Sequence, residues 1–204
     1  MKAVILCDGD IPQKHVIGHD VSGADLFIAA DGGANRANEL GFQPDIIIGD
    51  LDSYTVTGDE KALVIKNEYQ ETNDLEKALL YAFKKSASET IVFGATGKRL
   101  DHTLKNLSVL LQYNSKFDSI VLVDDYATMK IIQSPFNESF EVGTIISLFP
   151  LSGKVEGITT KGLKYPLSNE ALENGVRDGS SNEAIEETVE IIFKKGDLLL
   201  LTHH

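Results

Sequence analysis

Short apolar runs alternate with amphipathic segments over the first 125 positions of the chain. The runs predict strands at Ala3–Cys7, Leu26–Ala30, Asp45–Ile48, Ala62–Ile65, Thr90–Phe93 and Ile120–Val123. Helices are predicted near Gly33–Leu40, Asp74–Lys85 and His102–Tyr113, and the second has Leu75, Ala78, Leu79 and Ala82 at helical spacing. Such alternation indicates a mostly parallel sheet with helices on both faces.

Beyond about Asp125 the pattern becomes one of short strands separated by glycines. Strand-like runs occur at Ile131–Ile132, Phe140–Val142, Ile145–Phe149, Val155–Thr159, Val189–Phe193 and Asp197–Leu201, and no long helix is predicted. This pattern is typical of an all-β sandwich or a small barrel. We therefore expect an α/β domain over residues 1–125 and an all-β domain over residues 126–204, with the boundary near residues 125–135.

The composition favours a globular protein without a membrane contact. Hydrophobic residues make up 42% of the chain, and no apolar run is long enough to span a bilayer. The N-terminal sequence MKAVILCDGD enters a strand directly and lacks the features of a signal peptide. Cys7 is the only cysteine, which excludes an intrachain disulfide and favours a reducing compartment. A cytoplasmic location is expected.

The formal net charge of -12 bears on the class of partner. Nucleic-acid binding requires a positively charged surface, and no cluster of Lys and Arg of that kind occurs, so we expect no nucleic-acid partner. Acidity is compatible with a bound divalent cation or a cationic substrate. It is equally compatible with solubility alone.

Asp50 and Asp52 follow the apolar run Ile46–Ile48 and its closing Gly49. If this segment is extended, both carboxylates point to the same side and could share one cation. Mg²⁺ prefers oxygen ligands, often one or two carboxylates with water and phosphate oxygens. The alternative is an acidic turn, with Ser53, that caps the next helix.

The segment Glu71–Lys77 combines a helix start with a further carboxylate. Asn73 is a good N-cap, and Glu76 three residues later completes the pattern of a capping box. Asp74 falls in the first turn, where the helix dipole favours a negative charge. From these residues alone a structural role is sufficient to explain all three positions.

The sequence Gly94-Ala95-Thr96-Gly97-Lys98-Arg99 follows a predicted strand and precedes a predicted helix. Backbone N–H groups and the two cations of such a turn suit a polyphosphate. The spacing of the glycines differs from that of a P-loop, and no G-x-G-x-x-G fingerprint occurs. A glycine turn with Asp101 as a helix cap is the alternative.

A third acidic turn, Asp31-Gly32-Gly33, ends the run Leu26–Ala30. In open α/β sheets ligands bind at the carboxyl ends of the strands, so a nucleotide with its metal is expected here. His15 and His19 have the i, i+4 spacing of metal ligands, but Gly18 argues against a helix. A role on the surface or in a loop is favoured for both.

The motifs ADGGANR, PDIIIGDLDS, TNDLEKAL and GATGKRLDH occur in an order that resembles the thiamine pyrophosphokinase family. The segments TKGLKYPL (residues 160–167) and GSSN (residues 179–182) resemble the thiamine-site segments of that family. The chain departs from the family pattern at Glu71, Asn73 and Lys98, and it has Tyr165 where some members have Trp.

The resemblance implies transfer of pyrophosphate from ATP to the hydroxyl of thiamine, giving thiamine diphosphate and AMP. It also implies an α/β domain followed by a β-sandwich, and a homodimer with composite sites. Positions matching Asp50, Asp52 and Asp74 would hold Mg²⁺, with Arg99 and Asp101 at the phosphates. Nucleotide contacts are expected from Asp31, Gly32, Gly33, Asn73, Gly94, Gly97 and Lys98, and thiamine contacts from Tyr165, Ser181 and Asn182.

Two other classes of function are compatible with these residues. A metal-dependent phosphohydrolase would use the same carboxylates to activate water. A non-catalytic sensor would bind the nucleotide or thiamine without turnover. Asp74 and Asp101 are both candidates for a group that accepts the hydroxyl proton, and the sequence does not choose between them.

Overall fold

The computed structural model describes residues 1–56, 58 and 60–204. The chain divides into two compact units, Met1–Asp125 and Tyr126–His204. Among the described residues, the first unit contains six strands and four α-helices, and the second contains strands only.

The first unit is built on a parallel sheet whose strands follow the order β6-β5-β1-β2-β3-β4. The strands are β1 Lys2–Leu6, β2 Leu26–Ala30, β3 Ile46–Gly49, β4 Leu63–Lys66, β5 Glu89–Phe93 and β6 Ser119–Val123. The helices are α1 Lys14–Ser22, α2 Gly33–Leu40, α3 Asp74–Lys84 and α4 Leu100–Tyr113, followed by a 3-10 turn at Asn114–Lys116. The predicted parallel α/β sheet is confirmed.

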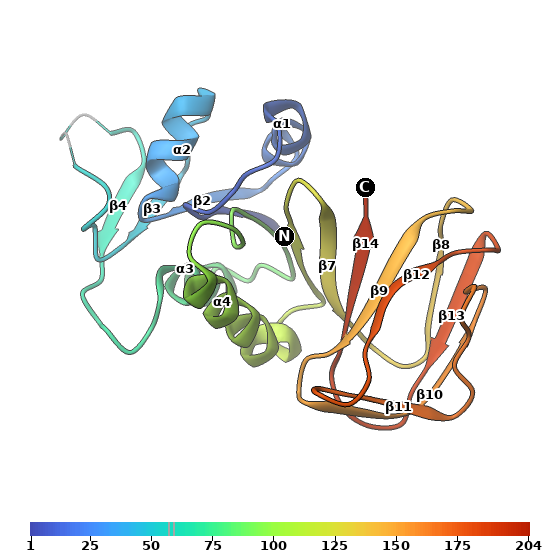
Figure 1. Cartoon of the computed structure of the whole chain (residues 1–204). Coiled ribbons are helices and arrows are strands. Elements are labelled where there is room, and N and C mark those ends of the chain that lie inside the picture. Colours follow the sequence, from blue (N-terminus) through green and yellow to red (C-terminus); the bar gives the residue numbers. More distant parts are fainter. Residues whose placement is uncertain (57, 59) are drawn as a thin grey trace. The chain divides into compact units, whose positions relative to one another are not determined.

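Helices cover both faces of this sheet, with α1 and α2 on one side and α3 and α4 on the other (Figure 1). Alternate residues of β1 therefore enter two cores. Val4 and Leu6 pack with Ile17 of α1 and Ala37 of α2. Because the central strands are buried on both faces, they read as continuous apolar runs.

Gly18 argued against a helix around His15 and His19, and helix α1 corrects this expectation. The segment is helical, and both histidines are exposed on its surface as expected. A glycine costs a helix about 1 kcal/mol. Complete burial of Ile17 against the sheet offsets this cost, which the sequence pattern did not reveal.

The second unit consists of two antiparallel sheets. Of the two folds that the sequence allowed, it is therefore a sandwich and not a barrel. One sheet has the order β12-β9-β14-β7, and the other has the order β11-β10-β13-β8. The strands are β7 Ala127–Ile132, β8 Phe136–Ser139, β9 Ile145–Pro150, β10 Lys154–Lys161, β11 Glu170–Glu173, β12 Gly179–Glu183, β13 Thr188–Ile192 and β14 Leu198–His203. Their inward side chains, among them Ile146, Ile158 and Leu198, form one core.

Three strands of the sandwich differ from the sequence prediction. Phe140–Val142 is not a strand: the chain turns there, with Thr144 N–H donating to the carbonyl of Glu141 (3.0 Å), and β8 lies earlier. Strands β11 and β12 were not predicted. Both lie at the edge of a sheet and carry few apolar residues, so the hydrophobic pattern does not mark them.

Candidate active site

A cleft of about 320 Å³ lies at the carboxyl ends of the parallel strands. The turns after β1, β2, β3 and β5 line it, together with the first residues of α3 and α4. The turns meet because all strands of a parallel sheet point in the same direction. Asp31, Asp74 and the Gly94–Arg99 turn, which are far apart in the sequence, thus face one cavity.

The three carboxylates of Asp31, Asp50 and Asp74 form an acidic cluster in the first unit. One oxygen atom from each lies within 4.8 Å of the others. Asp31 is almost completely buried, and its Oδ1 has no hydrogen-bond partner. Burial, with smaller effects of Asp74 and Asp52, raises the pKa of Asp31, although a hydrogen bond from Ser53 opposes the shift.

Asp52 lies outside this cluster. The extended conformation that would let Asp50 and Asp52 share one cation does not occur, because Leu51 has a left-handed backbone with φ of 63°. The N–H of Asp52 instead turns back to Oδ1 of Asp50 (3.2 Å), and its exposed carboxylate accepts from the hydroxyl of Ser53 (2.8 Å). The structure therefore brings Asp50 and Asp74 together and adds Asp31 to them.

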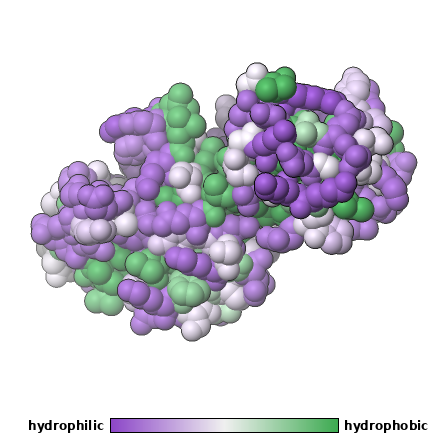
Figure 2. Space-filling model, turned by 90° about the horizontal axis from the view of Figure 1, so that it is seen from below, coloured by the Kyte–Doolittle hydropathy of each residue, from purple (hydrophilic) through white to green (hydrophobic). Residues whose placement is uncertain are grey.

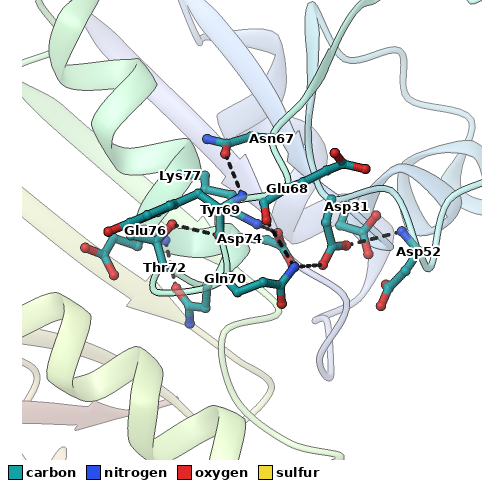
Figure 3. A network of polar contacts seen from close by, with 12 residues as sticks. Asp31, Asp52, Asn67, Glu68, Tyr69, Gln70, Thr72, Asp74, Glu76 and Lys77 are labelled. Atoms are coloured by element: carbon teal, nitrogen blue, oxygen red, sulfur yellow. Dashed lines mark hydrogen bonds and ion pairs between the residues drawn. The ribbon is translucent and has the colours of Figure 1, made fainter.

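Further polar groups approach these carboxylates from the loop before α3 and from α3 itself. Nε2 of Gln70 lies 3.5 Å from Oδ2 of Asp50, and Figure 3 shows this side chain directed towards the acidic cluster. Lys77, which is buried, donates from Nζ to Oδ1 of Asp74 (3.0 Å). Neither contact was predicted from the sequence.

Helix α3 begins at Asp74 because Asn73 caps it. Oδ1 of Asn73 accepts a hydrogen bond from the N–H of Glu76 (2.9 Å), which confirms the predicted N-cap. The side chain of Glu76 contacts Lys105 and Gln112 of α4 rather than completing a capping box. The cap fixes the backbone next to Asp74, and so its carboxylate.

The turn Gly94–Arg99 places two cations at the cleft. Nζ of Lys98 lies 2.9 Å from Oδ1 of Asp8, and Nε of Arg36 lies 3.1 Å from the same oxygen. Arg99 is exposed and donates to Asp101. This pairing raises the pKa of Arg99 and lowers that of Asp101, so both groups are charged at neutral pH.

The predicted glycines are required by close packing of the backbone. Gly94 has φ of 68°, and a Cβ there would lie 2.5 Å from the carbonyl oxygen of Cys7. A Cβ at Gly33 would lie 2.0 Å from the carbonyl oxygen of Leu6. Gly32 and Gly97 line the cleft, whereas Gly33 is buried between α2 and β1.

Two further polar residues line the cleft that the sequence analysis did not identify as site residues: Asp8 and Asn106. Asp8 had a usable signal, because β1 ends in Asp8-Gly9 as β2 ends in Asp31-Gly32. Asn106 lies inside a helix, where no local pattern marks it.

Cys7 is buried, and burial with the nearby Asp74 and Asp8 raises its pKa to about 12, so it remains a thiol.

Comparisons with known proteins agree with this geometry. The thiamin pyrophosphokinase catalytic domain matches residues 18–122, and the vitamin B1 binding domain of the same family matches residues 132–198. The thiamine pyrophosphokinase of Bacillus subtilis is 31% identical over 184 residues, with 86% of each chain covered. The chain belongs to the thiamine pyrophosphokinase family.

Other relatives support the same family. Thiamine pyrophosphokinase 1 of rice (Oryza sativa) is 28% identical, with 82% of this chain and 75% of the relative covered. The crystal structure of the Bacillus subtilis thiamine pyrophosphokinase superposes with a TM-score of 0.85 at 27% identity, covering 100% of this chain and 99% of the other. Enzymes of this family transfer pyrophosphate from ATP to thiamine. These comparisons do not support the phosphohydrolase or the sensor.

The residues expected to meet thiamine all lie in the unit that matches the vitamin B1 binding domain. Tyr165 is exposed, with 64% of its surface accessible. The buried amide of Asn182 holds the Tyr165 backbone in both directions, accepting from its N–H (3.0 Å) and donating to its carbonyl (2.8 Å). Ser181, which precedes Asn182 in the chain, is exposed and has a left-handed backbone with φ of 55°.

No described helix is long and apolar enough to cross a membrane. Hydrophilic residues predominate on the face drawn in Figure 2, and apolar residues appear there in scattered groups.

Proposed function

We propose that this protein transfers the pyrophosphoryl group of ATP to the hydroxyl of thiamine, giving thiamine diphosphate and AMP, at the cleft of the first unit. The observation that carries the proposal is the meeting of an acidic cluster with a turn that bears two cations. Pyrophosphoryl transfer needs positioning and charge neutralisation more than covalent help from the protein.

The acidic cluster fits a divalent cation such as Mg²⁺. Three carboxylate oxygens within 4.8 Å of one another repel each other, and the buried Oδ1 of Asp31 has no hydrogen-bond partner. Hard oxygen ligands of this kind suit Mg²⁺. We propose Asp50 and Asp74 as ligands, with Asp31 as a further one; Asp52 would join only by turning its carboxylate inwards. When bound, the ion would offset charge on the phosphate oxygens.

The chain's own cations would hold the phosphates. Lys98 is paired with Asp8 and would exchange this partner for a phosphate oxygen. Arg99 offers a planar group of donors that suits two phosphate oxygens at once. Asp101 holds this guanidinium, and its lowered pKa makes it a poor acceptor for the thiamine hydroxyl proton.

The second unit would supply the residues that bind thiamine. Tyr165 would stack on the cationic ring, Ser181 would meet the pyrimidine, and Asn182 would hold the Tyr165 backbone in place. We further propose a cytoplasmic homodimer in which one chain's sandwich completes its partner's site. The support for the dimer is the family resemblance of the motifs.

The test is release of AMP from ATP and Mg²⁺, with and without thiamine. The proposal requires release that depends strictly on thiamine; release without it would indicate a hydrolase, and no release would indicate a sensor. Asp50→Asn should lower kcat/KM by about 100-fold or more while the protein stays folded. Asp118→Asn is the matched control. Asp118 is exposed at the amino end of β6, whereas the cleft lies at the carboxyl ends of the strands.

A further inference from the structure

We propose that Asn106 is a positioning residue that fixes the metal-binding and phosphate-binding parts of the cleft relative to each other. The inference rests on the proposed function, because it concerns the same cleft. Asn106 lies in the second turn of α4 and is 8% exposed. Its amide group contacts two segments that are far from each other in the sequence.

The first contact holds the phosphate turn. Nδ2 of Asn106 donates to the carbonyl oxygen of Ala95 at 2.7 Å, and this contact is buried. The carbonyls on either side are held by backbone groups: Gly9 N–H donates to Gly94 (2.8 Å), and Asp10 N–H donates to Thr96 (2.8 Å). Asn106 is therefore the side chain that completes a set of three consecutive anchors, on which the positions of Lys98 and Arg99 depend.

The second contact holds the start of α3. Nδ2 of Asn73 donates to Oδ1 of Asn106 at 2.7 Å, while Oδ1 of Asn73 caps the helix at Glu76. Asp74, a member of the acidic cluster, is the next residue. A continuous line of hydrogen bonds thus runs from the helix that carries Asp74, through two amides, to the turn that carries the cations.

A side-chain amide can make both of these hydrogen bonds, to Ala95 and from Asn73, because it donates from one atom and accepts at another. Leucine has a similar volume and can do neither. Without these bonds the Ala95 carbonyl loses its donor, and the start of α3 loses its link to the turn. A small displacement of groups in a catalytic site is expected to weaken binding there more than it weakens the fold.

The experiment compares Asn106→Leu with Gln112→Leu. Gln112 also joins α4 to α3, because its Nε2 donates to Oε1 of Glu76 (3.0 Å). Gln112 and Glu76 do not line the cleft. Mn²⁺ binding to the nucleotide-free protein and the KM values for ATP and thiamine are measured. Asn106→Leu should weaken Mn²⁺ binding and raise the KM for ATP, each by about 10-fold or more, and leave the KM for thiamine within about two-fold. Gln112→Leu should change only the melting temperature.

A double-mutant cycle tests whether the two amides act together. Asn73→Ser keeps an oxygen near the N–H of Glu76 but lacks the amide that donates to Asn106. Combined with Asn106→Leu, it should weaken Mn²⁺ binding no further than Asn106→Leu alone, within about two-fold, because both changes break the same link. If Asn106→Leu does not fold, weaker Mn²⁺ binding by Asn73→Ser alone supports the inference, and unchanged binding overturns it.

A folded Asn106→Leu protein with wild-type Mn²⁺ binding and KM for ATP would overturn the inference, as would additive effects in the cycle. Thiamine-dependent AMP release by the wild-type protein is measured in the same preparations. Its absence would contradict the proposed function. Its presence together with unaffected Asn106 variants would contradict this inference alone.

Discussion

Asp31 combines three features that are individually unfavourable in a folded protein. Its backbone is left-handed, with φ of 43°, its carboxylate is buried, and Oδ1 lacks a hydrogen-bond partner. Strained and unsatisfied groups of this kind cluster at functional sites, where the surrounding structure holds them in place. In the proposed site a bound cation would satisfy the oxygen and balance the charge of the cluster.

Replacing Asp31 by Asn should stabilise the metal-free protein at neutral pH. Burial raises the pKa of Asp31 in the folded state, so this group favours folding most when protonated, and stability is lost as the pH rises through the folded pKa. Asparagine removes the charge and tolerates a left-handed backbone. In EDTA we expect the Tm to rise by about 2–4 °C, the effect of ~1 kcal/mol in a chain of this size.

The gain should shrink on acidification, because wild-type Asp31 is then protonated as well. The same variant should bind Mn²⁺ more weakly. Thermal unfolding in EDTA across the acid range, with Asp118→Asn as the control, measures both parts of the stability effect. A lower Tm for Asp31→Asn at neutral pH would contradict the assignment of a destabilising buried charge.

Arg99 should be irreplaceable by lysine. An ammonium keeps the charge but lacks the planar pair of donors that binds two oxygens, so kcat/KM for ATP should fall by about 10-fold or more. The side chain is exposed, so the Tm should change little. Arg177→Lys in the second unit, where an exposed Arg pairs with Glu170, is the matched control. Wild-type kinetics for Arg99→Lys would reduce Arg99 to a surface cation.

At the scale of elements, the close contact between α2 and β1 depends on Gly33. Gly33 lies in the first turn of α2, and its missing Cβ makes room for the backbone of Leu6. The approach brings the turn after β2 next to Asp8 and the turn after β1. The glycines of the Asp31-Gly32-Gly33 motif therefore shape the cleft through packing as well as through the backbone that they present to it.

Gly33→Ala should destabilise the protein by about 1–3 kcal/mol, because backbone atoms must move to admit the methyl group. Gly23→Ala is the control, because a Cβ there would lie 3.6 Å from the carbonyl oxygen of His19, which is an ordinary contact. Urea unfolding of the two variants measures the difference. Equal stabilities would show that the helix shifts without cost.

At the scale of the whole molecule, the proposed chemistry is divided between the two units. The acidic cluster and the phosphate turn belong to Met1–Asp125, and Tyr165, Ser181 and Asn182 belong to Tyr126–His204. A change in the second unit should therefore alter the KM for thiamine and leave the KM for ATP unchanged. Tyr165 is suited to this test because it is exposed and contributes no buried surface to the core.

Tyr165→Ala should raise the KM for thiamine several-fold and leave the KM for ATP nearly unchanged, because stacking on a cationic ring is worth roughly 0.5–2 kcal/mol. Mixing an inactive Asp50→Asn chain with an inactive Tyr165→Ala/Ser181→Ala chain tests the composite site. If partner chains share sites, heterodimers regain one intact site and some activity. Mixtures that form heterodimers but stay inactive would place each site within one chain.

The sequence by itself determined the fold class and most of the cleft. Buried parallel strands have no solvated face, so they appear as apolar runs that end in Asp31-Gly32, Gly49-Asp50 and Gly94-Ala95. The capping residue of α3 could be identified because its hydrogen bond is local, three residues along the chain. The family was identified because the motifs keep their order.

The tertiary structure decided what depends on contacts between distant residues. Burial of Ile17 made α1 helical despite Gly18, and pairing at sheet edges made strands of the polar segments β11 and β12. The left-handed Leu51 turned Asp52 away from the acidic cluster, while the convergence of β2, β3 and α3 placed Asp31 in it. Asn106 gained its two partners only when α3, α4 and β5 packed together, since no pattern along one chain segment records a contact to two others.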